Sequence, residues 1–151
     1  MPVTAVTHLN FQGRARAALD LYASVFGGEV RVATYGDLGL PAGLPDADQV
    51  VFGQVTAPSG FTVMAYDVPV AGRAATEPAV TRREHGTTIT TSPFFVAVHA
   101  DTVAEVEEPW AGLADGGTVV EPLGPSAWAP AFGMLTDRFG ITWVLDVAAA
   151  G

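Results

Sequence analysis

The first residues of the chain carry a hydrophobic pattern that predicts a strand followed by a helix. Residues 3–11 alternate along an extended chain, with one apolar face and a mixed face that holds His8 and Asn10. After a glycine, residues 14–26 place apolar side chains at helical spacing and leave charged ones for solvent. The glycine pair at 27–28 predicts the end of this helix, because glycine adopts the left-handed conformation that closes many helices.

Three further strands are predicted in the first half of the chain. Residues 29–35 follow the glycine pair as a strand, and the Gly/Pro-rich stretch 36–48 is expected to be a mobile loop. Residues 49–57 and 61–66 predict a hairpin around a Pro-Ser-Gly turn. These elements together make a β-α-β-β-β unit.

The second half of the chain begins with the same elements. Residues 94–100 predict a strand, and Thr102 with Glu105 matches a capping box at the start of a helix. An apolar stripe at helical spacing continues past Pro109, which should kink the helix. The helix is expected to end at a second glycine pair, 116–117.

The chain closes on a predicted hairpin. Residues 118–121 predict a short strand, 122–130 a loop, and 131–146 a hairpin whose turn is marked by Asp137 and Gly140. The Asp137 side chain is expected to bond nearby backbone. The order strand, helix, paired glycines, strand, loop, hairpin therefore occurs twice, which indicates duplication of a whole supersecondary unit.

The segment between the two halves shows little periodicity. Residues 68–92 contain several prolines and glycines and are expected to link modules at about 3–67 and 93–147, with a partly ordered lid as one alternative. A length of 151 residues, 49% of them hydrophobic and 15% charged, suits one well-packed domain better than two ordinary ones. We therefore expect both modules to belong to a single domain, 1–151.

Composition excludes several classes of function. Sixteen acidic side chains against seven arginines and no lysine give a net charge of −9, which repels phosphate backbones and anionic lipids, so we expect neither nucleic acid nor a membrane as a partner. Without lysine or cysteine, the chain has no amine for a Schiff base and no thiol nucleophile. The missing cysteines, and the absence of a signal-like start or a long apolar run, predict a cytoplasmic protein.

Several stretches at the two ends of the chain form a set of motifs. They are residues 8–11, 18–22 and 26–29, and Trp128 followed by a Gly-x-x-Thr-Asp-Arg-Phe-Gly-x-x-Trp hairpin at 133–143. This set resembles the PhnB-like branch of the glyoxalase/bleomycin-resistance (vicinal oxygen chelate) superfamily. The resemblance implies an α+β fold of two tandem βαβββ modules whose mixed sheet curls around a cavity, commonly in a homodimer.

The resemblance also bears on cofactors. Enzymes of this superfamily hold a divalent metal through His and Glu ligands on facing strands, with open coordination positions for the substrate. His8 occupies the first ligand position. The remaining positions fall on Phe52 or Gln54, on Pro93 or Phe94, and on Val144. Because one ligand does not make a metal site, we expect no metal, and if one is present His8 would be its first ligand.

Eight residues are candidates for binding a small organic molecule. The polar ones could orient a ligand through an imidazole or an amide, although each could as easily pair with local groups. The others could line a pocket for a planar compound, although aromatic side chains in strands more often belong simply to the core. The candidates are His8, Asn10, Phe52, Gln54, Phe94, Trp128, Phe132 and Met134.

Three functional hypotheses follow from these candidates. The first is a protein that binds a small organic molecule in an apolar cavity without metal. The second is a divalent-metal-dependent lyase, isomerase or dioxygenase, whose further ligands would come from Glu121, Asp146, His99 or a neighbouring subunit. The third is a structural or regulatory dimer module with a filled cavity.

The remaining titratable residues have simpler interpretations. Asp67 and Asp146 end corresponding strands and could form an acid/base pair, although structural repetition explains them equally well. His85 lies in the linker and is expected to be solvated, with lid closure as its alternative role. His99 lies near a strand end, where a surface or helix-entry contact is expected.

Overall fold

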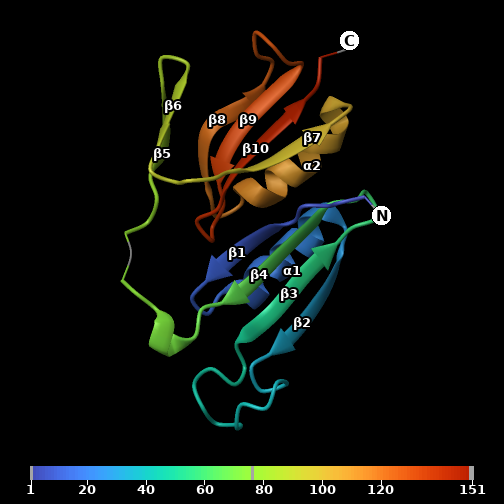
Figure 1. Cartoon of the computed structure of the whole chain (residues 1–151). Helices are drawn as coiled ribbons and strands as arrows, with labels where there is room; N and C mark the ends of the chain where they lie inside the picture. Colours follow the sequence, from blue (N-terminus) through green and yellow to red (C-terminus); the bar gives the residue numbers. More distant parts are fainter. Residues whose placement is uncertain (1, 76, 150–151) are drawn as a thin grey trace. The chain divides into compact units, whose positions relative to one another are not determined.

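The chain divides into two compact units in the computed structural model, Met1–Ala75 and Thr76–Gly151. The structure describes residues 2–75 and 77–149, so residue 76 of the predicted linker lies outside the described part. Each unit contains a four-stranded sheet with one helix packed on one of its faces (Figure 1). This arrangement confirms the expected α+β class and the duplicated βαβββ order.

The first unit follows the predicted order of elements. These are β1 (Thr7–Phe11), α1 (Ala15–Phe26), β2 (Glu29–Thr34), β3 (Val50–Thr56), β4 (Thr62–Asp67) and a short 3-10 helix, η1 (Val70–Gly72). The strand order is β1-β4-β3-β2, with β1 parallel to β4 and the other pairs antiparallel. Strand alternation points Leu9, Val55 and Val63 toward α1, where all three are fully buried.

The second unit repeats this topology and adds a hairpin before it. Its elements are β5 (Thr81–Glu84), β6 (Thr87–Thr90), β7 (Val96–Ala100), α2 (Val103–Ala114), β8 (Thr118–Gly124), β9 (Ala131–Thr136) and β10 (Thr142–Val147). The strand order is β7-β10-β9-β8, again with a parallel first pair. The expected capping box is present, since the backbone N–H of Thr102 donates to the Glu105 carboxylate at 2.9 Å. One α-helix runs through Pro109.

The segments predicted to be irregular contain more regular structure than expected. The linker, for which partial order was one alternative, contains η1 and the β5–β6 hairpin, whose turn places His85 and Gly86 at φ of 50° and 77°. Positive φ at both central residues matches the turns that suit two-residue hairpins, but His-Gly and polar strands give a weak sequence signal. β8 also continues to Gly124 through Pro122, with register shifts that absorb the proline.

A glycine in the third strand of each unit lets the helix approach the sheet closely. A Cβ at Gly53 would collide with the side chain of Leu19 on α1 and lie 2.9 Å from a backbone carbonyl oxygen of β4. A Cβ at Gly133 would lie 2.7 Å from the ring of Trp110 on α2. Because the two glycines occupy corresponding register positions, the helix-to-sheet contact is repeated in both units.

The paired glycines after each helix also have matching roles. Gly27 and Gly116 adopt φ of 73° and 75°, the left-handed conformation that turns the chain out of the helix. A Cβ at Gly28 or Gly117 would lie 2.9 Å or 2.5 Å from a carbonyl oxygen of the adjacent strand. The second glycine is therefore required for close approach of the chain to the sheet.

Asp67 ties three elements of the first unit together. Its carboxylate is buried and accepts hydrogen bonds from the backbone N–H groups of Gly13 at 2.8 Å, Ala15 at 3.0 Å and Val50 at 3.0 Å. The N-terminus of α1 has no cap from its own N-cap residue, Arg14. A remote carboxylate on β4 therefore satisfies backbone donors at the start of both α1 and β3.

Asp137 has a comparable role in the turn of the closing hairpin. One carboxylate oxygen accepts from the backbone N–H of Phe139 at 2.8 Å and of Ile141 at 3.1 Å. The other accepts from the indole N–H of Trp143 at 2.9 Å, in the core. The predicted turn is confirmed, and the aspartate also satisfies a buried tryptophan.

Replacing Gly133 with alanine should destabilise the protein by about 2 kcal/mol, because the added methyl group overlaps the Trp110 ring. Urea unfolding measures the change. Gly124→Ala is the matched control, since nothing lies within 4 Å of the added methyl group, and it should unfold at nearly the wild-type midpoint. Equal midpoints for the two variants would contradict this account of the close packing.

Replacing Asp67 with alanine should lower the free energy of unfolding by about 3 kcal/mol or more, because it leaves backbone N–H groups without their acceptor. Asp67→Asn keeps an acceptor oxygen and should fall between alanine and wild type. Asp48→Ala removes an exposed carboxylate nearby in the sequence and should change stability by less than about 0.5 kcal/mol. Urea titrations of the three variants rank the effects.

Candidate functional site

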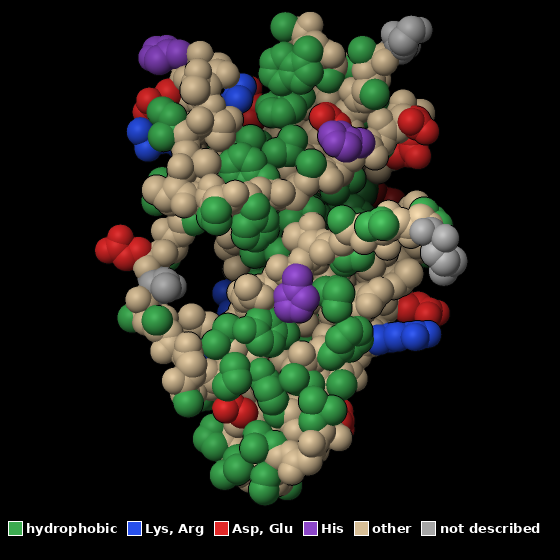
Figure 2. All heavy atoms as spheres, viewed as in Figure 1, with side chains coloured by type: hydrophobic (Ala, Val, Ile, Leu, Met, Phe, Trp, Pro, Cys, Tyr) green, Lys and Arg blue, Asp and Glu red, His purple; other side chains and the backbone are tan. Residues whose placement is uncertain are grey.

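The face of each sheet opposite its helix is open within its unit, and strand alternation decides which side chains lie on it. In the first unit, His8, Asn10 and Phe52 lie on this open face and are exposed, whereas the helix-side positions between them are buried. Figure 2 shows hydrophobic side chains exposed among polar ones over the strands of this unit. The open face is therefore the place where this unit can contact a ligand.

Cross-strand register places four open-face residues of the first unit in one row. Arg31 pairs with Gln54, Gln54 with Met64, and Met64 with His8, so the row crosses β2, β3, β4 and β1. The structure thus places two predicted site residues, His8 and Gln54, on one face with Asn10 and Phe52. Arg31 and Met64 were missed by the sequence analysis, which weighed single residues and not cross-strand neighbours.

His8 has two close neighbours on this face. Its Nδ1 atom lies 3.1 Å from the side-chain oxygen of Asn10, and its ring packs edge-on against Tyr66 with 5.4 Å between ring centroids. Both contacts hold the imidazole along the β1–β4 pair. Such local partners are the ordinary placement that the sequence left open for His8 and Asn10.

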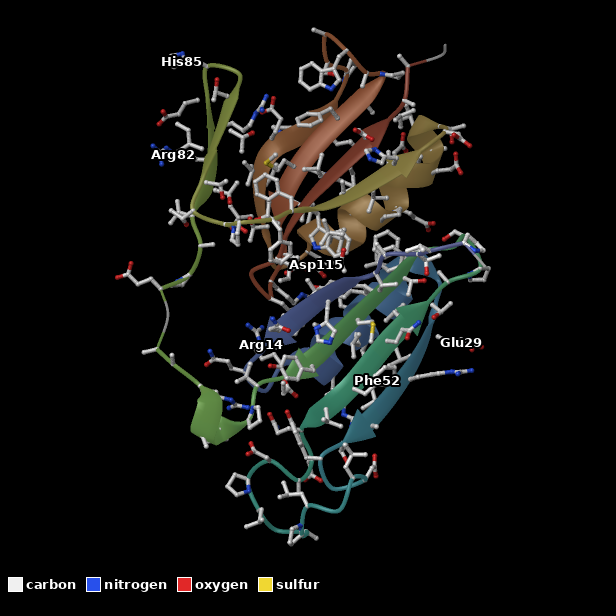
Figure 3. The ribbon with its side chains drawn as sticks, in the orientation of Figure 1. Arg14, Glu29, Phe52, Arg82, His85 and Asp115 are labelled. Carbon is white, nitrogen blue, oxygen red and sulfur yellow. The ribbon has the colours of Figure 1, made fainter. Side chains whose placement is uncertain are left out.

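A hollow of about 570 Å³ lies on the β2–β3 side of this sheet. It is lined by Gly27, Glu29, Arg31, Phe52, Gln54, Thr56, Ala57 and Pro58. Two of the predicted ligand residues, Phe52 and Gln54, line it, and Figure 3 shows Phe52 projecting from β3. The hollow combines an aromatic ring, an amide, a guanidinium and a carboxylate.

The second unit carries an aromatic cluster on its open face. The rings of Trp128 and Phe132 meet edge-on with 5.1 Å between centroids, and the Arg83 guanidinium lies 5.4 Å from the Phe132 centroid. The two aromatic residues were predicted as site residues. Arg83 was not, because it belongs to a hairpin whose sequence resembled a linker.

The two other candidates in the second unit are placed differently. Met134 is only 3% exposed, which is the core placement that the sequence left open for it. Because Gly133 faces Trp110 on α2, alternation puts Met134 on the face opposite the helix, and this face is covered at Met134. Phe94 lies just before β7 and is 45% exposed.

The two aspartates considered as an acid/base pair have unrelated environments. Asp67 points toward α1 and is fully engaged by backbone N–H groups. Register aligns it with Val147, and aligns Asp146 with Tyr66 on the open face. The actual partner of Asp146 is His99, whose Nδ1 hydrogen-bonds the carboxylate across β7 and β10.

His85 lies at the exposed tip of the β5–β6 hairpin, and Figure 3 shows it directed away from the strands of its unit. This agrees with the expected solvated position.

The donor set does not fit the divalent metal that the superfamily uses. The register counterpart of His8 in the second unit is Ala97, and the other positions aligned with metal ligands carry aromatic, amide or aliphatic side chains. Within residues 2–75 and 77–149, no group of three or more His, Asp or Glu side chains is arranged to hold an ion. These side chains therefore do not match the imidazole and carboxylate ligands of such a site.

Tyr35 joins the end of β2 to β4. Its hydroxyl donates a hydrogen bond to the backbone carbonyl of Asp67 at 2.8 Å. Burial raises the pKa of Tyr35 above its ordinary value, and the nearby acidic groups Tyr66, Asp46 and Asp67 raise this pKa further. The phenol therefore keeps its proton in the folded protein at a pH where the unfolded chain has begun to lose it.

Two βαβββ units with open sheet faces define the vicinal oxygen chelate class of fold. The model of the Glyoxalase/Bleomycin resistance protein/Dioxygenase superfamily matches residues 6–145, so the chain belongs to this superfamily. No curated protein matches the chain at a significant level.

Solved structures show the same fold over nearly the whole chain. Protein PA1353 from Pseudomonas aeruginosa is 30% identical with a TM-score of 0.78, covering 97% of this chain and 98% of its own. A PhnB protein from Bacillus cereus is 24% identical with a TM-score of 0.71, covering 97% and 100%. A glyoxylase/bleomycin resistance protein/dioxygenase domain from Frankia sp. EAN1pec is 12% identical with a TM-score of 0.66, covering 100% and 95%. The resemblance to the superfamily is thereby confirmed, and a PhnB protein is among the structures that share the fold.

The described residues contain no helix long and apolar enough to cross a membrane.

The raised pKa of Tyr35 predicts a pH dependence of stability. As pH rises from about 10 through this pKa, the unfolded chain binds fewer protons than the folded one, so the free energy of unfolding should fall. Tyr35→Phe should show a shallower fall. Urea unfolding between pH 8 and 11 measures both slopes, and identical slopes would contradict the assignment.

Proposed function

We propose that the protein binds a small organic molecule on the open face of its first sheet, without a metal. The observation that carries this proposal is the hollow of about 570 Å³ beside Phe52 and Gln54. Its volume falls within the range of roughly 300–1,000 Å³ typical of small-molecule sites. Its lining combines the apolar side chains of Phe52, Ala57 and Pro58 with the polar ones of Glu29, Arg31, Gln54 and Thr56.

The lining residues define the chemistry of the ligand. Phe52 is 42% exposed and offers a ring face to a planar apolar group. Arg31, the cross-strand neighbour of Gln54, supplies a guanidinium donor to the hollow, whereas the Gln54 amide already donates to Thr56 at 3.2 Å. We therefore propose a planar, amphipathic compound that carries a hydrogen-bond acceptor or an anionic group at one end.

The metal-dependent alternative has weaker support. His8 is on the open face, but its Nδ1 neighbours Asn10, and the corresponding position of the second unit is Ala97. The name of the Bacillus cereus relative proposes a 3-demethylubiquinone methyltransferase. In this chain the β1–α1 connection has a single glycine and the β7–α2 connection has none, so no glycine-rich turn is available for a methyl donor.

We also propose that the protein works in the cytoplasm as a homodimer. The cysteine-free sequence suits a reducing compartment. Exposed large hydrophobic side chains, including Leu38, Leu44 and Val70, supply surface that a second subunit could cover. Sedimentation of the purified protein tests the oligomeric state.

Replacing Phe52 should weaken binding of a planar amphipathic probe. We expect 8-anilinonaphthalene-1-sulfonate to lose about tenfold in affinity for Phe52→Ala, which corresponds to about 1.4 kcal/mol of aromatic contact. Fluorescence titration gives the dissociation constants. Val119→Ala removes a similarly exposed apolar side chain from the second unit and should bind like wild type. Unchanged affinity in Phe52→Ala would refute the assignment of the hollow.

Metal analysis separates the two functional hypotheses. Protein purified without chelator should contain far less than one equivalent of Mn, Fe, Co, Ni or Zn, and His8→Ala should leave this content unchanged. A stoichiometric metal that His8→Ala removes would favour the metal-dependent lyase, isomerase or dioxygenase. Native mass spectrometry of the same preparation would detect a co-purified organic ligand.

A further inference from the structure

His99 and Asp146 form a hydrogen-bonded pair on the open face of the second sheet. The parallel register of β7 and β10 sets the two residues opposite each other, and the Asp146 carboxylate accepts a hydrogen bond at Nδ1 of His99. The imidazole is 71% exposed, whereas the carboxylate is 22% exposed. The imidazole ring is therefore accessible, while the carboxylate that it contacts is mostly buried.

This geometry determines which imidazole nitrogen can react. A carboxylate bonded to Nδ1 favours the tautomer with its proton on Nδ1, which leaves a lone pair on Nε2. The carboxylate also holds the imidazole ring in this orientation. Neither of the other histidines has this arrangement, since Nδ1 of His8 neighbours an amide and His85 lies at a hairpin tip.

An aromatic surface lies in the same row of the sheet. Phe132 is the cross-strand partner of Asp146, so Phe132, Asp146 and His99 follow one another on β9, β10 and β7. With about 4.8 Å between strands, the backbone of Phe132 lies roughly 10 Å from that of His99, within reach of a bicyclic planar molecule. The Trp128 ring meets the Phe132 ring edge-on, and the Arg83 guanidinium lies over the Phe132 ring.

We propose that His99 is a general base for a small planar molecule held against Phe132 and Trp128, and that Asp146 is its positioning residue. A C–H or O–H proton of the molecule moves to Nε2 of His99. The electron pair of the broken bond stays on the molecule and either delocalises over it or expels a leaving group. Arg83 supplies positive charge near the anion that forms. This activity is separate from binding in the Phe52 hollow, which lies on the first sheet.

The elimination of 5-nitrobenzisoxazole tests the base directly. A base removes the ring C–H proton, the C–H electron pair forms the nitrile, and the N–O bond breaks to give a coloured 2-cyano-4-nitrophenolate, with no metal or co-reactant needed. We expect wild-type protein in EDTA to accelerate this reaction. The His99→Gln variant should be slower than wild type by at least about tenfold. His85→Gln is the matched control and should keep the wild-type rate, because its ring is solvated at the hairpin tip.

Two further measurements distinguish loss of the base from loss of binding. Quenching of tryptophan fluorescence by the probe should be unchanged in His99→Gln and weaker in Trp128→Ala. Circular dichroism should show native spectra for all variants, since the substituted side chains are exposed. A wild-type rate no higher than that of His99→Gln, or an equal loss in His85→Gln, would overturn the proposal. If the Phe52 titration fails and the elimination assay succeeds, only the proposed binding hollow is refuted.

The role of Asp146 has its own spectroscopic signature. In wild-type protein, imidazole ¹⁵N shifts should show His99 with its neutral proton on Nδ1. Asp146→Asn should shift the tautomer balance toward Nε2–H and lower the elimination rate, and Asp146→Glu should restore part of both. Unchanged ¹⁵N shifts in Asp146→Asn would show that the carboxylate does not orient His99, and would overturn its role.

Discussion

Each four-stranded sheet of this protein has one 12-residue helix to cover it, and the helix can bury only one face. Burial therefore alternates along strands such as β1 and β4. Inward positions such as Leu9, Val63 and Leu145 are fully buried, whereas their neighbours stay accessible. The open face is therefore a consequence of how the fold buries its core, and ligand chemistry can be placed there without disturbing the packing.

Comparison of the two units shows which positions this packing constrains. Glycines recur at the close contact between helix and sheet, at Gly53 and Gly133, and after each helix. Their replacement by a larger residue would push the helix off the sheet or strain the turn. Phe52 and Phe132 also occupy matching open-face positions.

Other open-face positions differ between the units. His8 corresponds to Ala97, Asn10 to His99, and Tyr66 to Asp146. Packing against the helix does not restrict these side chains, so the two copies of one scaffold carry different chemistry. In the first unit a histidine meets an amide and a phenol ring, and in the second a histidine meets a carboxylate.

The sequence by itself determined the duplicated βαβββ order, the helix ends at paired glycines and the closing hairpin, because these depend on local periodicity and turn chemistry. It also placed His8 and Asn10 on one face of the first strand, whereas strand register in the structure brought Phe52 and Gln54 onto the same face of the sheet. Only the tertiary structure joined His99 to Asp146, 47 residues apart, and set Arg83 against Phe132. Those contacts depend on strand register and on a polar hairpin, and neither leaves a periodic signal in the chain.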